Sequence, residues 1–341
     1  MALNVLFIGG TGQISLPCVE LAVAAGHKVS VFNRGVRDET LPEGVTSITG
    51  DMKDQAAYRA LGKTRWDVVA QFMAFTPEQM AEDIATFAGN AGQYIFISSA
   101  SVYEKPPRHY VITEKTPAIN PYWAYSQAKI ACEEMLKGAK DLPWTIVRPS
   151  HTVRSGLPTM MNEGDVIGHR MLAGKPVLVA GDGATPWTLT RSADFAVPFV
   201  RLFGNAAALG ETFHITGDRG FTWDEIYTAI AAGLGVEARI AHVPTDTLIR
   251  YHRDWEGPLL GDKTWAALFD NSKVKRVAGD FTCEENLAKI LEEPIAYFKK
   301  RLAANGPQTH PLDALMDRIA AEQAALGHLT GRTAVSPPRP W

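Results

Sequence analysis

The first two hundred residues alternate short apolar runs with segments of helical pattern. Apolar, β-rich runs occupy residues 5–8, 28–32, 45–49, 67–72, 94–98 and 144–147. Helical patterns occupy residues 17–25, 78–88 and 122–136. Strands that alternate with helices at this spacing predict parallel β-α units and a doubly wound α/β sheet. The strand runs are almost continuously apolar, which is typical of strands covered on both faces.

The pattern changes after residue 149. Gly, Pro, Met and Trp become frequent there, and the alternation breaks up. This change favours a smaller region over the carboxyl edge of the sheet, where ligands of such folds bind. From about residue 305 the sequence predicts one helix and a mobile tail.

Two helix starts are predicted beyond this point. Thr222 followed by Glu225 fits a capping box, in which each residue binds the backbone N–H of the other. Ser192 is predicted to be the N-cap of a helix at residues 192–196, with Asp194 favourable in its first turn.

Composition and charge exclude several classes of protein. At 341 residues the chain can bury a large core, in one large domain or two. The net charge of −3 shows no basic excess, so we expect neither nucleic acid nor an anionic membrane surface as a partner. No apolar run approaches the roughly 20 residues that a membrane span needs, and the N-terminus reads as a buried strand rather than a signal peptide.

The cysteines indicate a cytosolic protein. Cys18, Cys132 and Cys283 are odd in number, widely spaced and without metal-ligand partners nearby. We expect three reduced, mostly buried thiols and no metal site.

A glycine-rich turn lies between the first strand and the first helix. Gly9, Gly10 and Gly12 permit a tight turn and the close approach of a pyrophosphate to backbone amides. The following helix N-terminus adds a favourable partial positive charge. The third small position of the pattern is Ser15, which is small enough for close helix–strand packing. The turn predicts dinucleotide binding; a plain tight turn is the alternative.

The end of the second strand indicates which dinucleotide binds. An NAD-preferring site places an acidic residue there, whereas this chain has Asn33 and Arg34. An arginine can pair with a 2′-phosphate, so the sequence favours NADP over NAD. In the alternative, Arg34 stacks over the adenine and serves either cofactor. Asp51 follows the third strand, where its side chain can reach the adenine amine.

A phenol and an ammonium stand one helical turn apart at Tyr125 and Lys129. Residues four apart in a helix share a face. A lysine there can stabilise a phenolate and lower the tyrosine pKa. A tyrosine tuned in this way can take a proton from an alcohol or return one to a carbonyl. The pair alone favours a solvated helix face, because Tyr-x-x-x-Lys arises by chance in many chains.

The motifs occur in an order that resembles the extended short-chain dehydrogenase/reductases, the NAD-dependent epimerase/dehydratase family. The resemblance covers roughly residues 1–300. Its motifs are residues 9–12, 50–51, 98–103, the pair Tyr125 and Lys129, and Arg148 with Pro149. It implies a Rossmann domain at residues 1–165 with a return segment near 176–215, a mainly substrate-binding region at 166–304, and a C-terminal helix and tail at 305–341.

The resemblance also implies roles for individual residues. Ser99 matches the catalytic hydroxyl, Tyr125 the general acid/base, and Lys129 the residue that holds the nicotinamide ribose. A homodimer through the helix of Tyr125 is a further implication. The implied cofactor contacts are Gly9, Gly10, Thr11, Gly12, Gln13, Ile14, Asn33, Arg34, Asp51, Met52, Tyr125 and Lys129.

The chain departs from the family pattern where the substrate is bound. Dehydratases carry Asp-Glu after the catalytic hydroxyl, but Ala100 and Ser101 stand here, so we do not expect dehydration. His151 stands near the asparagine of nucleotide-sugar enzymes, which makes a UDP- or dTDP-sugar a less expected substrate. His151 either contacts a substrate hydroxyl, carries a proton, or is a hydrogen-bonded strand-end residue.

Two later residues are candidates for the substrate cleft. Arg191 could bind an anion or hydroxyl, and Trp187 could form an apolar wall for a sugar ring; a surface salt bridge and ordinary packing are the alternatives. Residues 261–263 and 269–273 resemble sugar-modifying relatives, but the sequence assigns them no role.

The sequence therefore predicts NAD(P)-dependent hydride transfer at a secondary alcohol or ketone of a carbohydrate-like substrate. An epimerase and a dehydrogenase or reductase remain open, because both use the same Ser, Tyr and Lys. The alternative class is a non-catalytic Rossmann protein that senses nucleotides or binds RNA.

Overall fold

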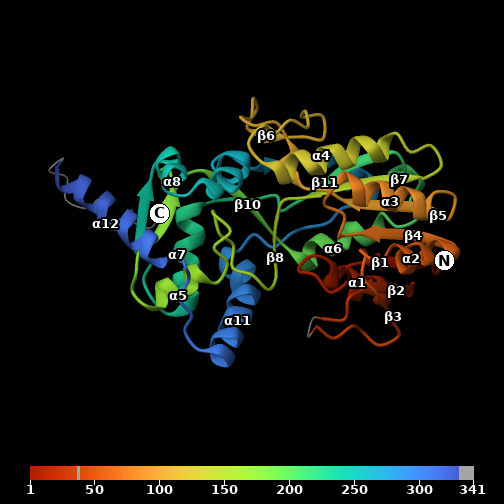
Figure 1. Cartoon of the computed structure of the whole chain (residues 1–341), viewed down its shortest axis with the longest axis horizontal. Coiled ribbons are helices and arrows are strands. Elements are labelled where there is room, and N and C mark those ends of the chain that lie inside the picture. The colour runs from red at the N-terminus through yellow and green to blue at the C-terminus, as the bar shows by residue number, and fades with distance from the viewer. Residues whose placement is uncertain (37–38, 330–341) are drawn as a thin grey trace.

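The computed structural model describes residues 1–36 and 39–329, and its central element is a seven-stranded parallel sheet (Figure 1). The strand order is β11-β7-β5-β4-β1-β2-β3. The order reverses between β1 and β4, which is the point where ligands of such sheets bind. The strands are β1 (Asn4–Ile8), β2 (Lys28–Asn33), β3 (Thr46–Thr49), β4 (Trp66–Gln71), β5 (Ala91–Ile97), β7 (Trp144–Pro149) and β11 (Glu211–Ile215).

Helices cover both faces of the sheet (Figure 1). Side chains alternate along β1, so Val5 and Phe7 enter one core while Leu6 and Ile8 enter the other. The first core is closed by α1 (Ser15–Ala24), α6 (Ser192–Arg201) and α10 (Ser272–Ala278). The second is closed by α2 (Gln55–Arg59), α3 (Pro77–Phe87) and α4 (Ala124–Lys137). This double cover explains the continuously apolar strands.

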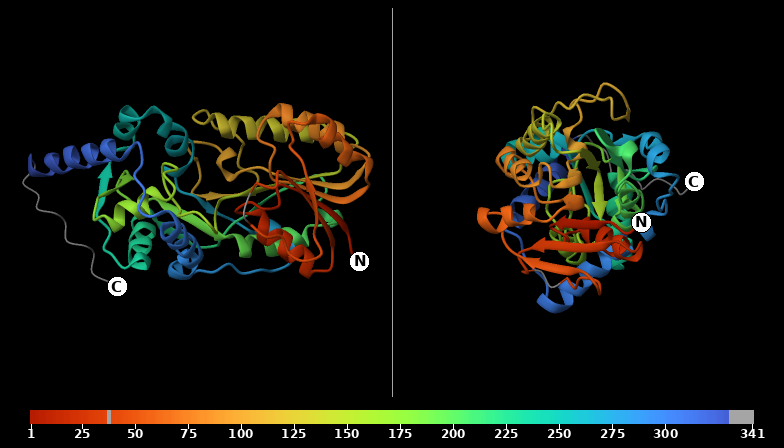
Figure 2. Two further views of the ribbon diagram at one scale, coloured as in Figure 1. Left: turned by 60° about the horizontal axis from the view of Figure 1, so that its bottom comes forward. Right: turned by 90° about the vertical axis from the view of Figure 1, so that its right-hand side faces the viewer.

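A second region lies beside one end of the sheet and makes the molecule elongated (Figure 2). It has its own buried core, which includes Trp187, Trp223 and Ile230. Its short strands form a three-stranded sheet of β8 (His151–Val153), β10 (Pro186–Arg191) and β12 (Gly220–Thr222), and a pair of β9 (Val177–Ala180) and β13 (Ile240–Val243). Its α-helices are α5 (Val166–Leu172), α7 (Trp223–Leu234), α8 (Thr245–Tyr251), α9 (Glu256–Pro258), α11 (Leu287–Asn305) and α12 (Asp313–Leu329).

Short elements complete the chain. Strands β6 (Val111–Ile112) and β14 (Leu268–Phe269) pair with each other. Residues Leu259–Lys263 form a π-helical turn, η5. The 3₁₀ turns are η1 (Ala60–Lys63), η2 (Ala100–Val102), η3 (Ala206–Ala208) and η4 (Arg253–Trp255). None of the helices within residues 1–36 and 39–329 is long and apolar enough to span a membrane.

The structure confirms the predicted doubly wound fold and the capping box of Thr222 and Glu225, where both reciprocal bonds form. The predicted cap at Ser192 is wrong. Arg191 is the N-cap, because β10 remains extended up to it, and the Ser192 hydroxyl donates to the Val153 carbonyl instead. The predicted C-terminal helix corresponds to α12, whereas residues 330–341 lie outside the described residues. The domain boundaries stay a prediction.

The capping box allows a test of the second region's stability. Thr222→Ala removes the acceptor for the Glu225 N–H, so we expect a loss of about 1 kcal/mol in the free energy of unfolding. Denaturant titration measures it, with Thr222→Ser as the control that keeps the hydroxyl. Equal stability of the alanine variant and the wild type would show that the cap contributes nothing.

Candidate active site

The Lys129 ammonium joins helix α4 to the segment after strand β4 and to the end of strand β5. The side chain is 1% exposed and projects from α4. Its Nζ donates to the carbonyl oxygen of Ala74, just after β4, at 2.7 Å and to that of Ile97, at the end of β5, at 2.8 Å. The ring centres of Phe75 and Phe96 lie 4.6 and 4.7 Å from Nζ. Burial lowers the pKa of Lys129 to about 7.

A buried carboxylate fixes the loop that Lys129 contacts. Asp83 on α3 accepts hydrogen bonds from Tyr94 Oη at 2.6 Å, from Gln71 Nε2 at 2.9 Å and from Tyr58. The Oε1 of the same glutamine accepts from the Met73 N–H at 2.7 Å. Burial raises the pKa of Asp83 to about 6, against the hydrogen bonds that favour its ionised form. This network has no signature in the sequence, because its members lie on separate elements and meet only in the folded chain.

Tyr125 and Ser99 line one cavity of about 410 Å³. Ser99 follows β5, and its Oγ lies 2.9 Å from Ser101 Oγ. Burial raises the pKa of Tyr125 to about 12, although its hydrogen bond with Ser99 acts in the opposite direction. The expectation that Lys129 lowers this pKa is therefore wrong for this structure: the buried phenol loses more by desolvation than its neighbours restore.

Behind the cavity, Glu133 fixes α4 to two strand ends. Its buried carboxylate accepts from Ser98 Oγ at 2.6 Å and from Arg148 Nε at 2.8 Å. Glu133 stands one turn beyond Lys129 on the same helix. The Arg148 of the Arg-Pro motif thus acts on the orientation of the helix that carries Tyr125 and Lys129.

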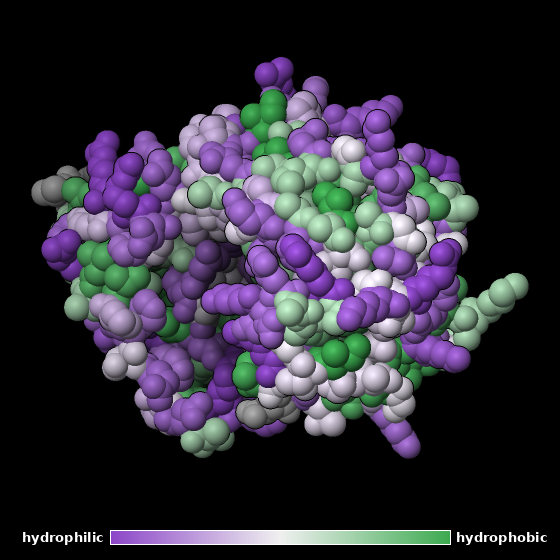
Figure 3. Space-filling view, turned by 45° about the vertical axis from the view of Figure 1, so that its right-hand side comes forward, coloured by the Kyte–Doolittle hydropathy of each residue, from purple (hydrophilic) through white to green (hydrophobic). Residues whose placement is uncertain are grey.

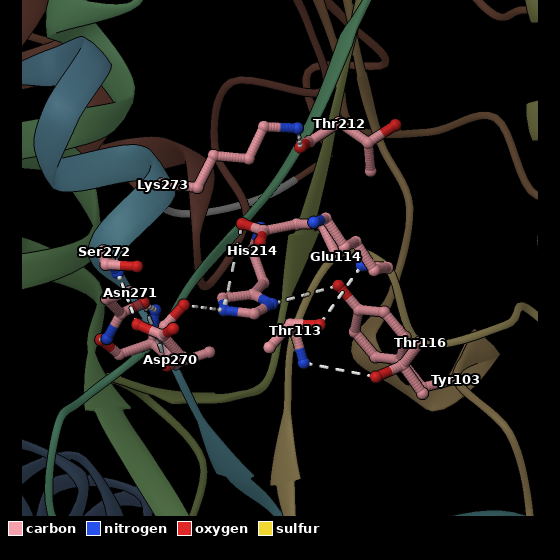
Figure 4. Close-up of polar contacts among 12 residues, drawn as sticks. Tyr103, Thr113, Glu114, Thr116, Thr212, His214, Asp270, Asn271, Ser272 and Lys273 are labelled. Atoms are coloured by element: carbon pink, nitrogen blue, oxygen red, sulfur yellow. Dashed lines mark hydrogen bonds and ion pairs between the residues drawn. The ribbon is translucent and has the colours of Figure 1, made fainter.

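The same network continues through Tyr103 and His214 (Figure 4). The Arg148 guanidinium lies 4.7 Å from the Tyr103 ring centre. His214 Nε2 donates to the Asp270 carbonyl oxygen at 2.8 Å, so Nδ1 is the acceptor for Tyr103 Oη at 3.0 Å. Burial lowers the pKa of His214 and keeps the ring neutral. These residues support the site from behind and do not line its cavity.

A second cavity, of about 390 Å³, lies at the switch point of the sheet. Figure 3 shows that one face of the molecule is deeply hollowed and that hydrophilic residues predominate around the hollow. Gly10 lies behind the second cavity, where a Cβ would meet Val31 at 2.7 Å. The predicted cofactor residues that line it are Gly9, Thr11, Gly12, Asn33, Arg34, Asp51 and Met52.

Gly9 shows why this turn requires glycine. Its φ is +84°, in the left-handed region, and a Cβ would lie 2.3 Å from Met73 Cγ. A side chain here would therefore strain the backbone and collide with Met73. These features fit the pyrophosphate of a dinucleotide at the N-terminus of α1.

Gln13 and Ile14 line the first cavity rather than the second. Gln13 Nε2 donates to the Thr152 carbonyl oxygen at 2.6 Å, and its Oε1 accepts from the Gly156 N–H at 3.0 Å. The glycine-rich turn is therefore hydrogen-bonded, through Gln13, to the segment that follows β7.

A buried arginine without a sequence signature connects the second cavity to the second region. Arg154 donates to the Gln13 carbonyl oxygen at 3.2 Å, to Glu39 at 2.8 Å and to Tyr297 Oη on α11 at 2.7 Å. Glu39 itself lines the second cavity. An acidic residue therefore lines the same cavity as Arg34, with its charge paired to Arg154.

The three predicted substrate residues of the second region have different positions. His151 lines the first cavity, and its Nδ1 accepts from Trp187 Nε1 at 3.0 Å. Burial, followed by the nearby Lys263, lowers the pKa of His151 to about 3, which favours the neutral ring. Trp187 also lines this cavity. Arg191 does not: its guanidinium forms two bonds with Asp194.

The first cavity contains three charged residues to which the sequence assigned no role, Lys105, Asp262 and Lys263. Asn120 helps to position Asp262 and Lys263. Its Nδ2 donates to the carbonyl oxygen of Gly261, the residue before Asp262, at 2.6 Å and to that of Ser101 at 2.7 Å. The sequence indicated residues 261–263 only through their resemblance to sugar-modifying relatives. Nothing in the local sequence predicts their long-range contact with Asn120.

Comparisons with known proteins agree with the geometry. Residues 9–165 match a family model described as NAD(P)H-binding. The chain is 25% identical over 336 residues to a 2′-dehydrokanamycin reductase of Streptomyces kanamyceticus, covering 95% of this chain and 93% of that protein. It is 30% identical over 256 residues to a chloroplast stem-loop binding protein of 41 kDa of Arabidopsis thaliana, covering 70% of this chain and 65% of that protein.

Solved structures share the fold. An epimerase from Methanothermobacter thermautotrophicus superposes with a TM-score of 0.74 at 16% identity, covering 89% of this chain and 94% of that chain. A UDP-glucose 4-epimerase from Bifidobacterium longum in complex with NAD⁺ and UDP gives 0.67 at 19% identity, covering 89% and 99%. The predicted resemblance to the extended short-chain dehydrogenase/reductases is confirmed for the fold and the NAD(P)-binding domain.

Two glycines with matched backbone conformation allow a test of whether the glycine-rich turn binds the dinucleotide. Gly9 and Gly26 have φ of +84° and +82°, but a Cβ on Gly26 would meet nothing within 4 Å. We expect Gly26→Ala to cost about 1 kcal/mol of stability and leave NADPH binding unchanged. Gly9→Ala should cost more stability and weaken NADPH binding by at least about tenfold, a difference of 1.4 kcal/mol, in a fluorescence titration. Equal NADPH affinity of the two variants would place the cofactor elsewhere.

Proposed function

We propose that this chain is an NAD(P)-dependent reductase that adds hydride to a ketone of a carbohydrate-like substrate. The observation that supports this most directly is the position of Tyr125 and Ser99 in one cavity, with the buried Lys129 one helical turn away. The dinucleotide supplies the hydride when bound. The protein's own residues bind the substrate oxygen and move its proton.

The protonated state of Tyr125 fits the reduction of a carbonyl group. Because burial raises its pKa to about 12, the phenol is protonated at neutral pH and is ready to donate to a carbonyl oxygen that gains negative charge. The Ser99 hydroxyl can donate a second hydrogen bond to the same oxygen. The similarity to a 2′-dehydrokanamycin reductase over 95% of the chain supports the same direction.

Lys129 fits the role of a cofactor ligand. An ammonium has three N–H donors, and two of them are used by the carbonyl oxygens of Ala74 and Ile97. The third has no partner among the described residues, and we assign it to a ribose hydroxyl, although Lys129 is 1% exposed and lines neither cavity. A lysine whose pKa is lowered to about 7 gains charge when such a partner binds, and that charge would favour ionisation of Tyr125.

The adenosine end of the second cavity supports NADP as the cofactor. Arg34 lines this cavity, and the charge of Glu39 is paired with Arg154. Arg34 is thereby left to bind a 2′-phosphate.

Replacing Arg34 tests this choice. Arg34→Ala should weaken NADPH binding about tenfold or more and leave NADH binding nearly unchanged, because only the phosphate ester loses a charge-assisted hydrogen bond. Fluorescence titration with both cofactors measures the ratio, and Arg65→Ala on the surface serves as the control. Equal loss for the two cofactors would indicate that Arg34 stacks on the adenine.

Replacing Tyr125 tests catalysis. Tyr125→Phe should lower kcat by roughly 10²–10⁴-fold while NADPH binding is kept, because the proton donor is lost and the ring remains. Tyr110→Phe, at an exposed position, is the matched control.

A second measurement distinguishes the two reaction types. Loss of the absorbance band of reduced nicotinamide on turnover identifies a reductase, whereas conversion of one epimer into another without that change identifies an epimerase.

The similarity to a stem-loop binding protein favours a second candidate, a non-catalytic RNA-binding function. A chain with this function would keep its full biological activity after Tyr125→Phe. We also retain as a proposal a homodimer through α4, where Met135 is an exposed apolar residue.

A further inference from the structure

Building on the proposed function, we infer that the substrate carries an acidic group, a carboxylate or a phosphate monoester, which binds the ammonium groups of Lys105 and Lys263 in the Tyr125 cavity. Four features of the cavity lead to this assignment. They are the unpaired Lys105, the weak pairing of Lys263, the balance of charge, and the position of both lysines relative to Tyr125.

Lys105 is a buried ammonium without a protein partner. Its side chain is 4% exposed and lines the cavity. Within residues 1–36 and 39–329, no side chain or carbonyl forms a hydrogen bond or an ion pair with its Nζ. Desolvation lowers its pKa, and the charge of Asp262 partly restores it. An unpaired buried charge is costly, and an anionic ligand would offset that cost.

Lys263 is paired only weakly. Its side chain is 6% exposed, and Nζ lies 3.4 Å from Asp262 Oδ2, a long contact for a charged hydrogen bond. The ring centres of Trp123 and Trp187 lie 5.6 and 6.0 Å from Nζ. The residue ends the π-helical turn η5, a rare geometry that occurs frequently at functional sites.

The charges that line the cavity leave an excess of positive charge. Among the described lining residues, Asp262 is the one carboxylate against the two ammonium groups. His151 also lines the cavity, and its lowered pKa keeps it neutral. Glu163 interacts with Lys263 but does not line the cavity; it accepts from the Met161 N–H at 2.7 Å, and burial raises its pKa. A single acidic group would complete the balance.

The lysines lie close to the reacting centre. The Trp123 ring, 5.6 Å from Lys263 Nζ, is centred 5.0 Å from the Tyr125 ring. Asp262 is also close enough to influence the pKa values of both Lys105 and Tyr125. One small molecule can therefore place its ketone at Tyr125 and an acidic substituent at the lysines.

Binding measurements on the NADP-loaded protein test this inference. The probes are D-glucuronate, D-glucose 6-phosphate, neutral D-glucose and cationic D-glucosamine, each measured by calorimetry. We expect one acidic sugar to bind at least about tenfold more tightly than the neutral and cationic sugars, and Lys105→Met or Lys263→Met to remove that preference. Preference for glucuronate indicates a carboxylate substrate, and preference for glucose 6-phosphate a phosphate ester.

Controls separate loss of charge from loss of folding. Methionine keeps an unbranched stem close to that of lysine and removes the charge, and unchanged NADPH affinity shows that each variant is folded. Lys115→Met, at an exposed position, is the matched control. The inference is overturned if both cavity variants bind the acidic sugar like the wild type, if neutral sugar binds equally well, or if neither acidic sugar binds at roughly 10 mM, well above usual KM values.

The readout is independent of turnover. Normal activity of Tyr125→Phe would refute the proposed reductase without changing the binding preference. If the wild type shows no preference for an acidic sugar, the inference that the substrate carries an acidic group is refuted and the catalytic assignment is unaffected.

Discussion

The buried ammonium of Lys129 is the constraint on which the site depends. A charge removed from water must be compensated, and here the compensation comes from two carbonyl oxygens at the ends of β4 and β5. Helix α4 and the two strand ends therefore have one relative position. The Asp83 network holds the loop after β4 from its other side, through Gln71. The residues of the cavity are thus positioned before any ligand arrives.

A second buried charge, the Glu133 carboxylate, fixes α4 in the same way one helical turn further along the helix. Glu133 and Arg148 form an ion pair among buried residues, which by itself is weak support for stability. Its effect is on orientation, because Ser98 and Tyr103 join the same network. Arg148 of the Arg-Pro motif is therefore a support for the helix and does not line the Tyr125 cavity, whereas Pro149 does line it.

The sequence predicted the features that depend on local pattern. Continuous apolar runs gave the parallel strands, and spacing gave the phosphate turn, the Tyr125–Lys129 pair and the Thr222 cap. Features that depend on burial could not be predicted. The spacing of Tyr125 and Lys129 suggested a lowered tyrosine pKa, but desolvation by the surrounding protein reverses the direction. Lys105 and Lys263 are 158 positions apart by number and meet only through tertiary packing.

Arg154 links three segments that are distant in sequence: the phosphate turn at Gln13, the segment after β2 at Glu39, and helix α11 at Tyr297. Because one planar guanidinium serves all three, displacement of any one segment alters the geometry available to the others. Substitutions at Glu39 and Tyr297 should therefore be energetically coupled although the two residues belong to different parts of the molecule. The second cavity, which Glu39 lines, and the packing of the second region are in this way linked through one side chain.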